Sequence, residues 1–368
     1  MNLLYELWLH DICDFDPKKV DKCIYIFKNA ENAFHSKPYS IERIKAFGMT
    51  KFLSAPKDFF NAERIIADCK EKDIHIITID DENYPDILKE SYLPPRILFA
   101  KGDISVLKNI FGICAVGTRK STPQGNLFIK TITKDLVKNN NITIVSGMAE
   151  GIDSFAHQGA LEGKGKTVAV LAGGVDIIYP PSNKKLYYEI IKNGAIISEK
   201  PPGTIGKPYF YIQRNRIMAG LSKAVIAVEG AFKSGTRHTV NHAHENNRDV
   251  YAVPSNPLSV QSQIPNQLIK EGAKPVLSAD DIIEDYIDVY PEYFNTSVKE
   301  EKTSFIELND NETKIVNYIK EKGGTASADD LAYDLNIPIG MLNGSLSILC
   351  IRGILVQTSQ NQYLLKEV

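Results

Sequence analysis

The sequence predicts an α/β protein: a Rossmann-like, doubly wound, mostly parallel sheet, with a small helical domain before it and a winged-helix domain after it. Strand-like and helix-like segments alternate over residues 110–288. The strand-like segments are short and almost wholly apolar, as in Ala224–Val228, which is typical of strands buried on both faces of a parallel sheet. Residues 309–368 contain three short helix patterns and a hairpin-like tail, and this combination describes a winged helix.

Periodicity and turn signals locate each element of the core. Thr122 can cap a helix that begins at Pro123, because proline suits the first helical position. Strands are predicted at 110–116, 142–146, 167–172, 195–199, 224–229 and 249–253, and helices at 123–139, 153–162, 182–193, 213–221 and 236–247.

The remaining segments complete a predicted domain plan. Residues 1–60 form a helical domain of SAM or helix-hairpin-helix type, and residues 61–109 form a bridging extension of the core, with a helix at 61–71 and strands at 74–79 and 96–100. The core covers 110–288, a polar and acidic linker covers 289–308, and the winged helix covers 309–368. Within it, helices are predicted at 310–322, 327–335 and 338–352, before the tail at 354–365.

Composition restricts the possible functions. The chain has 368 residues and a net charge of −2, so any binding of nucleic acid must come from a local patch. Its five cysteines are scattered without a CxxC pair, which favours a reducing compartment. No apolar run approaches the roughly 18 residues that cross a membrane. We therefore expect a cytoplasmic protein without a membrane partner.

Glycine-rich turns and cations follow several of the predicted strands. Because ligands bind beyond the carboxyl ends of the strands in such a sheet, these turns should meet along one rim. Helix N-termini and cations together favour phosphate groups. The rim residues are Gly117, Thr118, Arg119, Lys120, Ser146, Gly147, Arg214, Asn215, Arg216, Lys233, Ser234, Gly235, Thr236 and Arg237. No GxxxxGK[ST] motif occurs and the Gly117 turn lacks GxGxxG spacing. Repeated anion sites across a wide rim fit a polymer backbone better than one mononucleotide.

The sequence also contains histidines and an aspartate of the types used in catalysis or metal binding. His238, His242 and His244 share a helix but lack an HExxH motif and a third ligand, so they are interpreted as surface or contact histidines. Asp153 is interpreted as a helix cap, and His157 as a packed or hydrogen-bonded histidine. We assign no catalytic residue, no metal and no cofactor.

Two glutamates follow strands and leave an alternative open. Glu199 and Glu229 could meet over the sheet as a carboxylate pair, which would be the best sign of a hydrolase. They could instead hold Arg214 or Arg216 in place, and this second interpretation is favoured.

Taken in order, these motifs resemble the DprA family of DNA-processing proteins, also called Smf. The matching residues are Tyr84-Pro85, Pro94-Pro95, Leu98–Gly102, Val116–Arg119, Ser146–Asp153, His157, Tyr179-Pro180, Ser198-Glu199, Arg214–Arg216, Ser234–Thr236, Val253-Pro254 and Gly272-Ala273. The resemblance implies a Rossmann-like core that binds single-stranded DNA and forms a homodimer. It also implies loading of the RecA recombinase onto incoming strands during natural transformation, with no catalytic activity. Arg119 would be the leading DNA contact.

The sequence departs from the family pattern at three places. A basic residue often follows the Tyr-Pro pair in the family, whereas Pro181 stands here, and Lys184 or Lys185 is expected to replace it. Val253-Pro254 is usually followed by glycine, but Ser255 follows here. The Gly-Xaa-Asn that precedes the last core helix in the family is Ile264-Pro265-Asn266.

The predicted winged helix has an unusual charge for a DNA-reading module. Residues 304–368 contain five Lys and Arg against eight Asp and Glu, a net charge of 5 − 8 = −3. A DNA-reading head normally has a basic face. We therefore predict that this module contacts protein or regulates, and is not the main DNA-binding part.

Two other functions remain open from the sequence. One is a nucleotide or nucleoside-phosphate hydrolase that uses Gly235-Thr236 with Glu199 or Glu229. The other is a sensor whose core binds a small nucleotide and whose winged helix transmits the signal.

Overall fold

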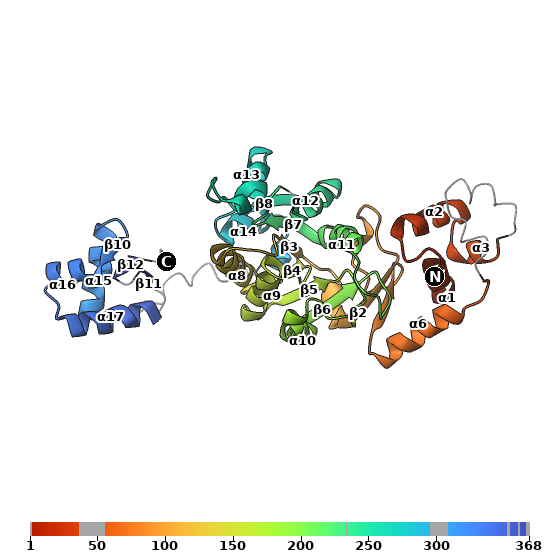
Figure 1. Cartoon of the computed structure of the whole chain (residues 1–368), viewed down its shortest axis with the longest axis horizontal. Helices are drawn as coiled ribbons and strands as arrows, with labels where there is room; N and C mark the ends of the chain where they lie inside the picture. Colours follow the sequence, from red (N-terminus) through yellow and green to blue (C-terminus); the bar gives the residue numbers. More distant parts are fainter. Residues whose placement is uncertain are drawn as a thin grey trace. The chain divides into compact units, whose positions relative to one another are not determined.

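The structure is a computed structural model, and it describes residues 2–36, 56–232, 234–294, 308–351, 354–359 and 361–365. The chain divides into two compact units, Met1–Thr296 and Ser297–Val368, and each is described by itself. In the larger unit, helices cover both faces of a central sheet (Figure 1).

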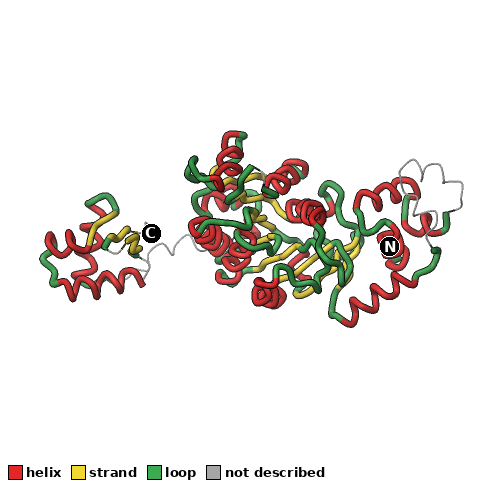
Figure 2. Tube along the Cα trace, viewed as in Figure 1, coloured by secondary structure: helices red, strands yellow, loops and turns green. Residues whose placement is uncertain are grey.

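Among the described residues of the larger unit, nine strands form one sheet in the order β1-β2-β6-β5-β4-β3-β7-β8-β9 (Figure 2). The strands are β1 (His75–Thr78), β2 (Ile97–Gly102), β3 (Gly112–Val116), β4 (Thr143–Ser146), β5 (Lys166–Val170), β6 (Gly194–Ser198), β7 (Ser222–Ala227), β8 (Asp249–Ala252) and β9 (Lys274–Pro275). Every residue of β3, β4 and β6 is buried, as expected for strands covered on both faces.

The winding of the sheet reverses beside β3. Strands from β6 across to β9 are parallel, whereas the β1–β2 and β2–β6 pairs are antiparallel. The predicted mostly parallel sheet is therefore confirmed. After β3 the chain adds β4, β5 and β6 on one side, and then adds β7, β8 and β9 on the other. Open α/β sheets bind ligands beyond the strand ends at such a switch point, which here lies between β3 and β7.

The helices form two layers, because alternate residues of a strand point to opposite faces. Cys114 and Val116 of β3 belong to a core shared with α11, α12 and α13, whereas Ile113 and Ala115 pack with α8, α9 and α14. The helices of this part are α6 (Phe60–Glu71), α7 (Asp86–Lys89), α8 (Pro123–Val137), α9 (Ile152–Glu162), α10 (Lys184–Asn193), α11 (Pro208–Gly220), α12 (Thr236–Glu245), α13 (Gln263–Lys270) and α14 (Asp280–Tyr286), with 3-10 turns η2 (Ile104–Leu107), η3 (Pro181–Asn183), η4 (Val260–Ser262) and η5 (Pro291–Tyr293).

Proline residues lie at two of the places where the observed helices differ from the predicted ones, in α11 and α13. Helix α11 begins at Pro208, five residues before the predicted start at 213, because proline fits the first helical position. The sequence patterns predict neither α13 nor α14. Pro265 lies in the first turn of α13, where the backbone N–H groups have no partner inside the helix, so proline is tolerated there.

Three described helices form the N-terminal region, α1 (Leu3–Ile12), α2 (Pro17–Phe27) and α3 (Ala30–Phe34). A partly buried ion pair joins this region to the core: Arg96 Nη2 lies 2.8 Å from Glu6 Oε1, and the Glu6 side chain is 1 % exposed whereas that of Arg96 is 24 % exposed. Residues 37–55 of the predicted helical domain lie outside the described residues.

The boundary between the core and the predicted linker falls later than expected. Phe294 is buried, and its ring centroid lies 5.5 Å from that of Phe111 in the core. Tyr290 and Tyr293 pack on the same cluster. Residues 290–294 are therefore part of the core and not of a linker, because their aromatic rings bury apolar area. Residues 295–307 lie outside the described residues.

The smaller unit contains α15 (Asp310–Glu321), β10 (Thr325–Ser327), α16 (Ala328–Asp334), α17 (Ile339–Ile351), β11 (Leu355–Ser359) and β12 (Gln362–Leu365). Its strands form a sheet in the order β10-β12-β11. The helices and the hairpin lie where the sequence predicts them, and the three-residue strand β10 is an addition. No described helix of the chain is long and apolar enough to span a membrane.

Candidate nucleic-acid interface

The turn after β3 places two exposed cations at the switch point. The backbone N–H of Thr118 donates to the carbonyl of Glu229 at 2.9 Å, so the turn is fixed to the chain that leaves β7. Gly117 has no room for a side chain, because a Cβ there would lie 2.4 Å from Ile152 Cγ1. Arg119 and Lys120 follow this fixed point, and both side chains are exposed.

The N-terminus of α8 is occupied by a side chain of the protein. Thr122 caps the helix, and its Oγ1 accepts from the Gly125 N–H at 3.0 Å, as predicted. The Glu229 carboxylate also accepts from the backbone N–H of Thr122 at 2.8 Å and from its hydroxyl. The expectation of a phosphate at this helix N-terminus is therefore wrong, because a carboxylate already provides the negative charge there.

Two tyrosines lie beside Arg119. The Arg119 guanidinium lies over the Tyr211 ring, 5.0 Å from its centroid, and the Tyr179 ring is 6.2 Å from that of Tyr211. Tyr179 is 53 % exposed. Exposed aromatic rings beside a cation can stack on nucleic-acid bases while the cation meets the backbone. Sequence reasoning missed this pair, although an aromatic residue near each basic turn is a signal that could have found it.

The glycine after β4 makes room for a buried arginine. A Cβ on Gly147 would lie 2.0 Å from Nη1 of Arg214. Ser146 is fully buried, and its hydroxyl donates to the Ala115 carbonyl at 2.7 Å. We therefore exclude the Ser146 side chain from the contact surface, since it has no exposed atom to offer.

Asp153 holds the 147–149 loop and does not cap α9. Its Oδ2 accepts from the N–H groups of Gly147 at 3.2 Å and Ala149 at 3.4 Å. Burial raises the pKa of Asp153, while the charge of Arg214 opposes that rise. The predicted cap is therefore wrong in detail, because the carboxylate turns back toward the loop and Gly151 is the residue at the N-cap.

The two arginines of α11 are structural in their contacts. Arg214 is 7 % exposed and donates from Nη1 to the Val170 carbonyl, and burial lowers the pKa of its guanidinium. Arg216 forms an ion pair with Glu199 in which both side chains are less than a tenth exposed. The favoured interpretation of Glu199 as the residue that holds an arginine is confirmed for Arg216.

The two glutamates do not form a catalytic pair. Glu199 follows β6 and Glu229 follows β7, and three strands lie between these two in the sheet. Four strand spacings correspond to about 19 Å. The hydrolase alternative loses the carboxylate pair on which it depended.

A cavity of about 330 Å³ lies at the switch point, and we call it the switch-point recess. Asn215, which is 9 % exposed, belongs to its wall, whereas Arg216 does not. The lining residues are Val116, Gly117, Thr118, Arg119, Ala149, Asp153, Tyr211, Ile212, Arg214, Asn215, Met218, Ser234, Gly235, Thr236 and Thr239. Lys233, another predicted contact, lies outside the described residues.

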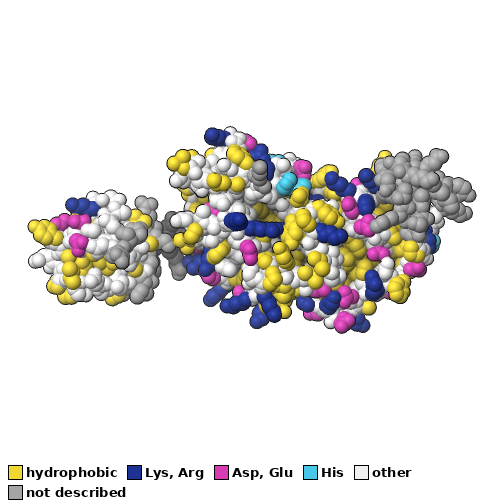
Figure 3. All heavy atoms as spheres, in the orientation of Figure 1, with side chains coloured by type: hydrophobic (Ala, Val, Ile, Leu, Met, Phe, Trp, Pro, Cys, Tyr) yellow, Lys and Arg dark blue, Asp and Glu magenta, His cyan; other side chains and the backbone are white. Residues whose placement is uncertain are grey.

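The other predicted cations lie away from the recess lining. Lys185 is 90 % exposed and lies 3.7 Å from Glu189, and Lys184 is exposed beside it at the start of α10. Arg237 forms an ion pair with Glu271 at 2.9 Å. On the face drawn in Figure 3, Lys and Arg side chains are interspersed with apolar and acidic ones over the core.

The histidines fit structural roles. His157 is fully buried, its Nδ1 lies 2.6 Å from Thr167 Oγ1, and burial lowers its pKa to about 3. Its interpretation as a packed, hydrogen-bonded histidine is confirmed. His242 pairs with Glu245 at 2.7 Å. Within the described ranges, no group of three potential ligands could hold a metal ion.

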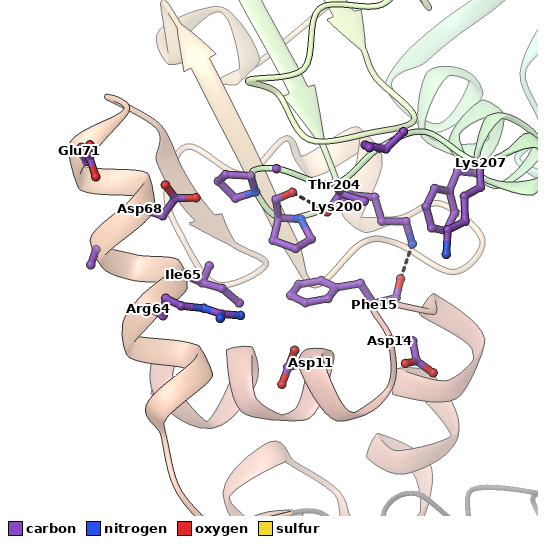
Figure 4. A pocket seen from close by; sticks show the side chains of 16 residues that line it. Asp11, Asp14, Phe15, Arg64, Ile65, Asp68, Glu71, Lys200, Thr204 and Lys207 are labelled. Carbon is purple, nitrogen blue, oxygen red and sulfur yellow. Dashed lines mark hydrogen bonds between the residues drawn. The ribbon is translucent and has the colours of Figure 1, made fainter.

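A larger cavity, of about 860 Å³, lies between α1, α6 and the 200–207 segment (Figure 4). Lys200 donates to the Phe15 carbonyl and lies 4.5 Å from the centroid of the Phe210 ring. Acidic side chains, among them Asp11, Asp68 and Glu71, line the cavity together with Arg64 and Lys207. This balance of charges makes it a weaker candidate for a polyanion than the recess beside Arg119.

Comparison with known proteins identifies the family. The sequence matches the family described as DNA recombination-mediator protein A over residues 75–287, which is more than half of the chain. The chain belongs to this family. A DNA processing protein DprA of Bacillus subtilis is 40 % identical over 222 residues, which is 60 % of this chain and 74 % of the relative. The DprA of Streptococcus pneumoniae is 39 % identical over 209 residues, covering 57 % of this chain and 73 % of that protein.

Solved structures of the family share the fold. The X-ray structure of DprA from Streptococcus pneumoniae superposes with a TM-score of 0.66 at 31 % identity, covering 77 % of this chain and 97 % of that one. DprA from Helicobacter pylori, whose structure is described as giving insight into a unique single-stranded DNA binding mode, superposes with a TM-score of 0.53 at 28 % identity, covering 58 % of this chain and 96 % of that one. The family match begins at the first residue of β1, so it spans all nine strands of the sheet and the residues that line the recess.

Proposed function

We propose that this chain binds single-stranded DNA across the switch point of its sheet. The observation that carries the proposal is the exposed Arg119, held over Tyr211 at the place where an open α/β sheet binds its ligands. The family match supports it, and so does the single-stranded DNA binding described for the Helicobacter pylori relative.

The proposed contacts fall into three groups, which are exposed cations, residues at the recess and aromatic rings. Arg119 and Lys120 meet backbone phosphates, with Lys184 and Lys185 further along the surface. Gly117, Thr118, Arg214 and Asn215 line the recess, and Gly147 leaves room for Arg214. Ser234, Gly235 and Thr236 line it as well. Arg216 and Arg237 are not proposed as phosphate contacts, because Arg216 forms an ion pair with Glu199 and Arg237 forms one with Glu271. Tyr179 and Tyr211 are added as surfaces for base stacking.

We further propose that the protein works as a recombination mediator in the cytoplasm. It would protect incoming single strands and load RecA onto them during natural transformation. It would act as a homodimer formed through the core, without a catalytic step, cofactor or metal of its own. The match to the family of DNA recombination-mediator proteins supports this role. A mediator needs a surface that binds a DNA strand, and it needs no reaction centre.

The smaller unit is proposed to be a winged helix that contacts protein. Helix α17, Ile339–Ile351, would be the reading helix if this unit bound duplex DNA. It contains no charged residue, and Ile339 and Met341 are more than half exposed. A helix without cations cannot neutralise phosphates, so an apolar protein surface suits it better. Deleting residues 304–368 should therefore weaken single-strand affinity much less than Arg119→Ala does.

The proposed function is tested by a salt titration of fluorescent oligo-dT binding, with the wild type and Arg119→Ala. We expect the logarithm of the wild-type affinity to fall linearly with the logarithm of salt concentration, with a slope of about −0.7 for each phosphate neutralised. Arg119→Ala should bind more weakly and give a shallower slope. No binding by the wild type at low salt would overturn the proposal.

A further inference from the structure

The switch-point recess contains polar side-chain atoms that have no partner among the described residues. Oγ1 of Thr236 and Oγ of Ser234 are shielded from solvent and make no hydrogen bond, and Nε of Arg214 is in the same state. Thr236 is only 3 % exposed. A buried polar atom without a hydrogen-bond partner lowers the stability of the fold by about 1–3 kcal/mol. Several such atoms around one cavity therefore indicate that a bound ligand supplies their hydrogen-bond partners.

The same wall of the recess presents a helix N-terminus that the protein does not cap. Helix α12 has ten residues, and its N-cap is Gly235, which offers no side-chain acceptor. Gly235 also has nothing within 4 Å of the position where a Cβ would stand, so the first turn is open. This contrasts with α8, where the Glu229 carboxylate already accepts from the backbone N–H of the N-cap residue Thr122. The His238 N–H donates to the Gly235 carbonyl. The N–H groups of Thr236 and Arg237 at the start of α12, together with the two hydroxyls, therefore favour one anionic oxygen cluster.

We propose that the recess binds the terminal phosphomonoester of a DNA strand, and this inference rests on the proposed binding of single strands. A terminal phosphate carries close to two negative charges at neutral pH and three free oxygens, whereas an internal phosphodiester has one charge and two free oxygens. The terminal phosphate, with more charge and more free oxygens, suits the donors at the recess better than a phosphodiester does. These donors come from Ser234, Thr236, the start of α12 and Arg119. A strand that ends in the recess also needs a single opening, whereas a continuing strand must enter and leave.

The two hydroxyls have different surroundings from the nearby Ser121. The Ser121 hydroxyl donates to Asn126 Oδ1, so its hydrogen bond is already made within the protein. Ser121 is not part of the recess lining. It therefore gives a matched control, in which a hydroxyl is removed from the same rim without removing a free donor.

The experiment compares three internally labelled oligo-dT strands of about 20 nucleotides, longer than the site of a typical single-strand-binding fold. They carry a 5′-phosphate, a 3′-phosphate or free hydroxyls at both ends. We expect the wild type to bind one phosphorylated strand about tenfold more tightly than the hydroxyl strand, which is the effect of one charge-assisted contact. The arm that shows the preference identifies which end enters the recess. Equal binding of all three strands would overturn this inference and leave the proposed function intact, whereas no binding of any strand would overturn both.

Variants then assign the preference to the recess. Thr236→Val and Ser234→Ala should each reduce the ratio of affinities toward one, and Thr236→Ser should retain it because the hydroxyl remains. Ser121→Ala should leave the ratio unchanged. A ratio that stays at about ten in both Thr236→Val and Ser234→Ala, in protein whose thermal unfolding matches the wild type, would show that the phosphate binds elsewhere and would refute the assignment.

Discussion

Arg119 and Arg216 look alike in the sequence but have opposite surroundings in the structure. Both were expected on one basic rim, with Arg119 in the turn after a predicted strand and Arg216 near the start of a predicted helix. Arg119 is exposed and lies over an aromatic ring, whereas Arg216 is 5 % exposed and is paired with Glu199. A cation of the predicted basic rim can therefore be exposed for contact with a ligand, as Arg119 is, or buried in a structural ion pair, as Arg216 is. The element that carries the cation decides which, because Arg214–Gly220 of α11 are buried, whereas Arg119 and Lys120 in the turn after β3 are exposed.

Arg216→Ala should produce the largest effect on stability. Removing the guanidinium leaves the Glu199 carboxylate buried without its partner, and breaking a buried pair in this way costs about 3–5 kcal/mol. The free energy of unfolding from urea titration measures the loss. Replacing both partners, as Glu199→Leu with Arg216→Met, should recover much of it. If Arg216→Ala kept wild-type stability but lost DNA affinity, the distinction between the two arginines would fail.

His157 is a second buried basic side chain, and unlike Arg216 it is held in its neutral form by burial, which lowers its pKa. Burial lowers its pKa to about 3 in the folded state, while the unfolded chain takes up a proton near 6.5. The unfolded state therefore binds more protons between these values, so stability falls as the pH drops below 6.5, by up to about 1.4 kcal/mol per pH unit. At pH 5 the loss should be about 2 kcal/mol.

Urea titrations of the wild type and His157→Gln across this pH range measure the difference. The variant should be less stable at pH 7.5, because it disturbs a buried hydrogen bond, but its stability should depend less on pH. Parallel pH profiles for the two proteins would contradict the assignment of a neutral buried His157.

Tyr211→Leu should affect DNA binding with little change in the fold. Loss of one stacking surface, and of the ring beneath Arg119, should weaken oligo-dT binding by about five- to tenfold. The salt dependence should remain close to that of the wild type, because no cation is removed. A changed slope with unchanged affinity at low salt would show that the ring only positions Arg119.

Lys185→Ala should give the smallest effect. Its ammonium group is almost fully exposed and lies 3.7 Å from Glu189, so its contribution should be about twofold or less in affinity. Lys184→Ala is the matched neighbour at the same helix start. A larger loss for either variant would extend the contact surface from the recess toward α10.

The sequence by itself determined most of the architecture. Apolar strands such as β3 and β7, separated by helix patterns, are sufficient to predict a doubly wound sheet, because only a parallel sheet covered on both faces buries such strands. It also placed the Gly117–Arg119 turn at the carboxyl end of β3 and indicated the family. The sequence patterns did not predict α13, whose first turn contains Pro265, and they assigned Phe294, which is buried in the core, to the linker.

Tertiary structure alone decided which polar groups are available to a ligand. Glu229 fills the helix N-terminus at Thr122, Glu199 neutralises Arg216, and Ser146 is hydrogen-bonded in the core. None of these pairings is local in the sequence, so no motif could reveal them. The physical reason is that a polar group's availability depends on its burial and on its partner, and both are set by packing between segments that meet only in the folded chain.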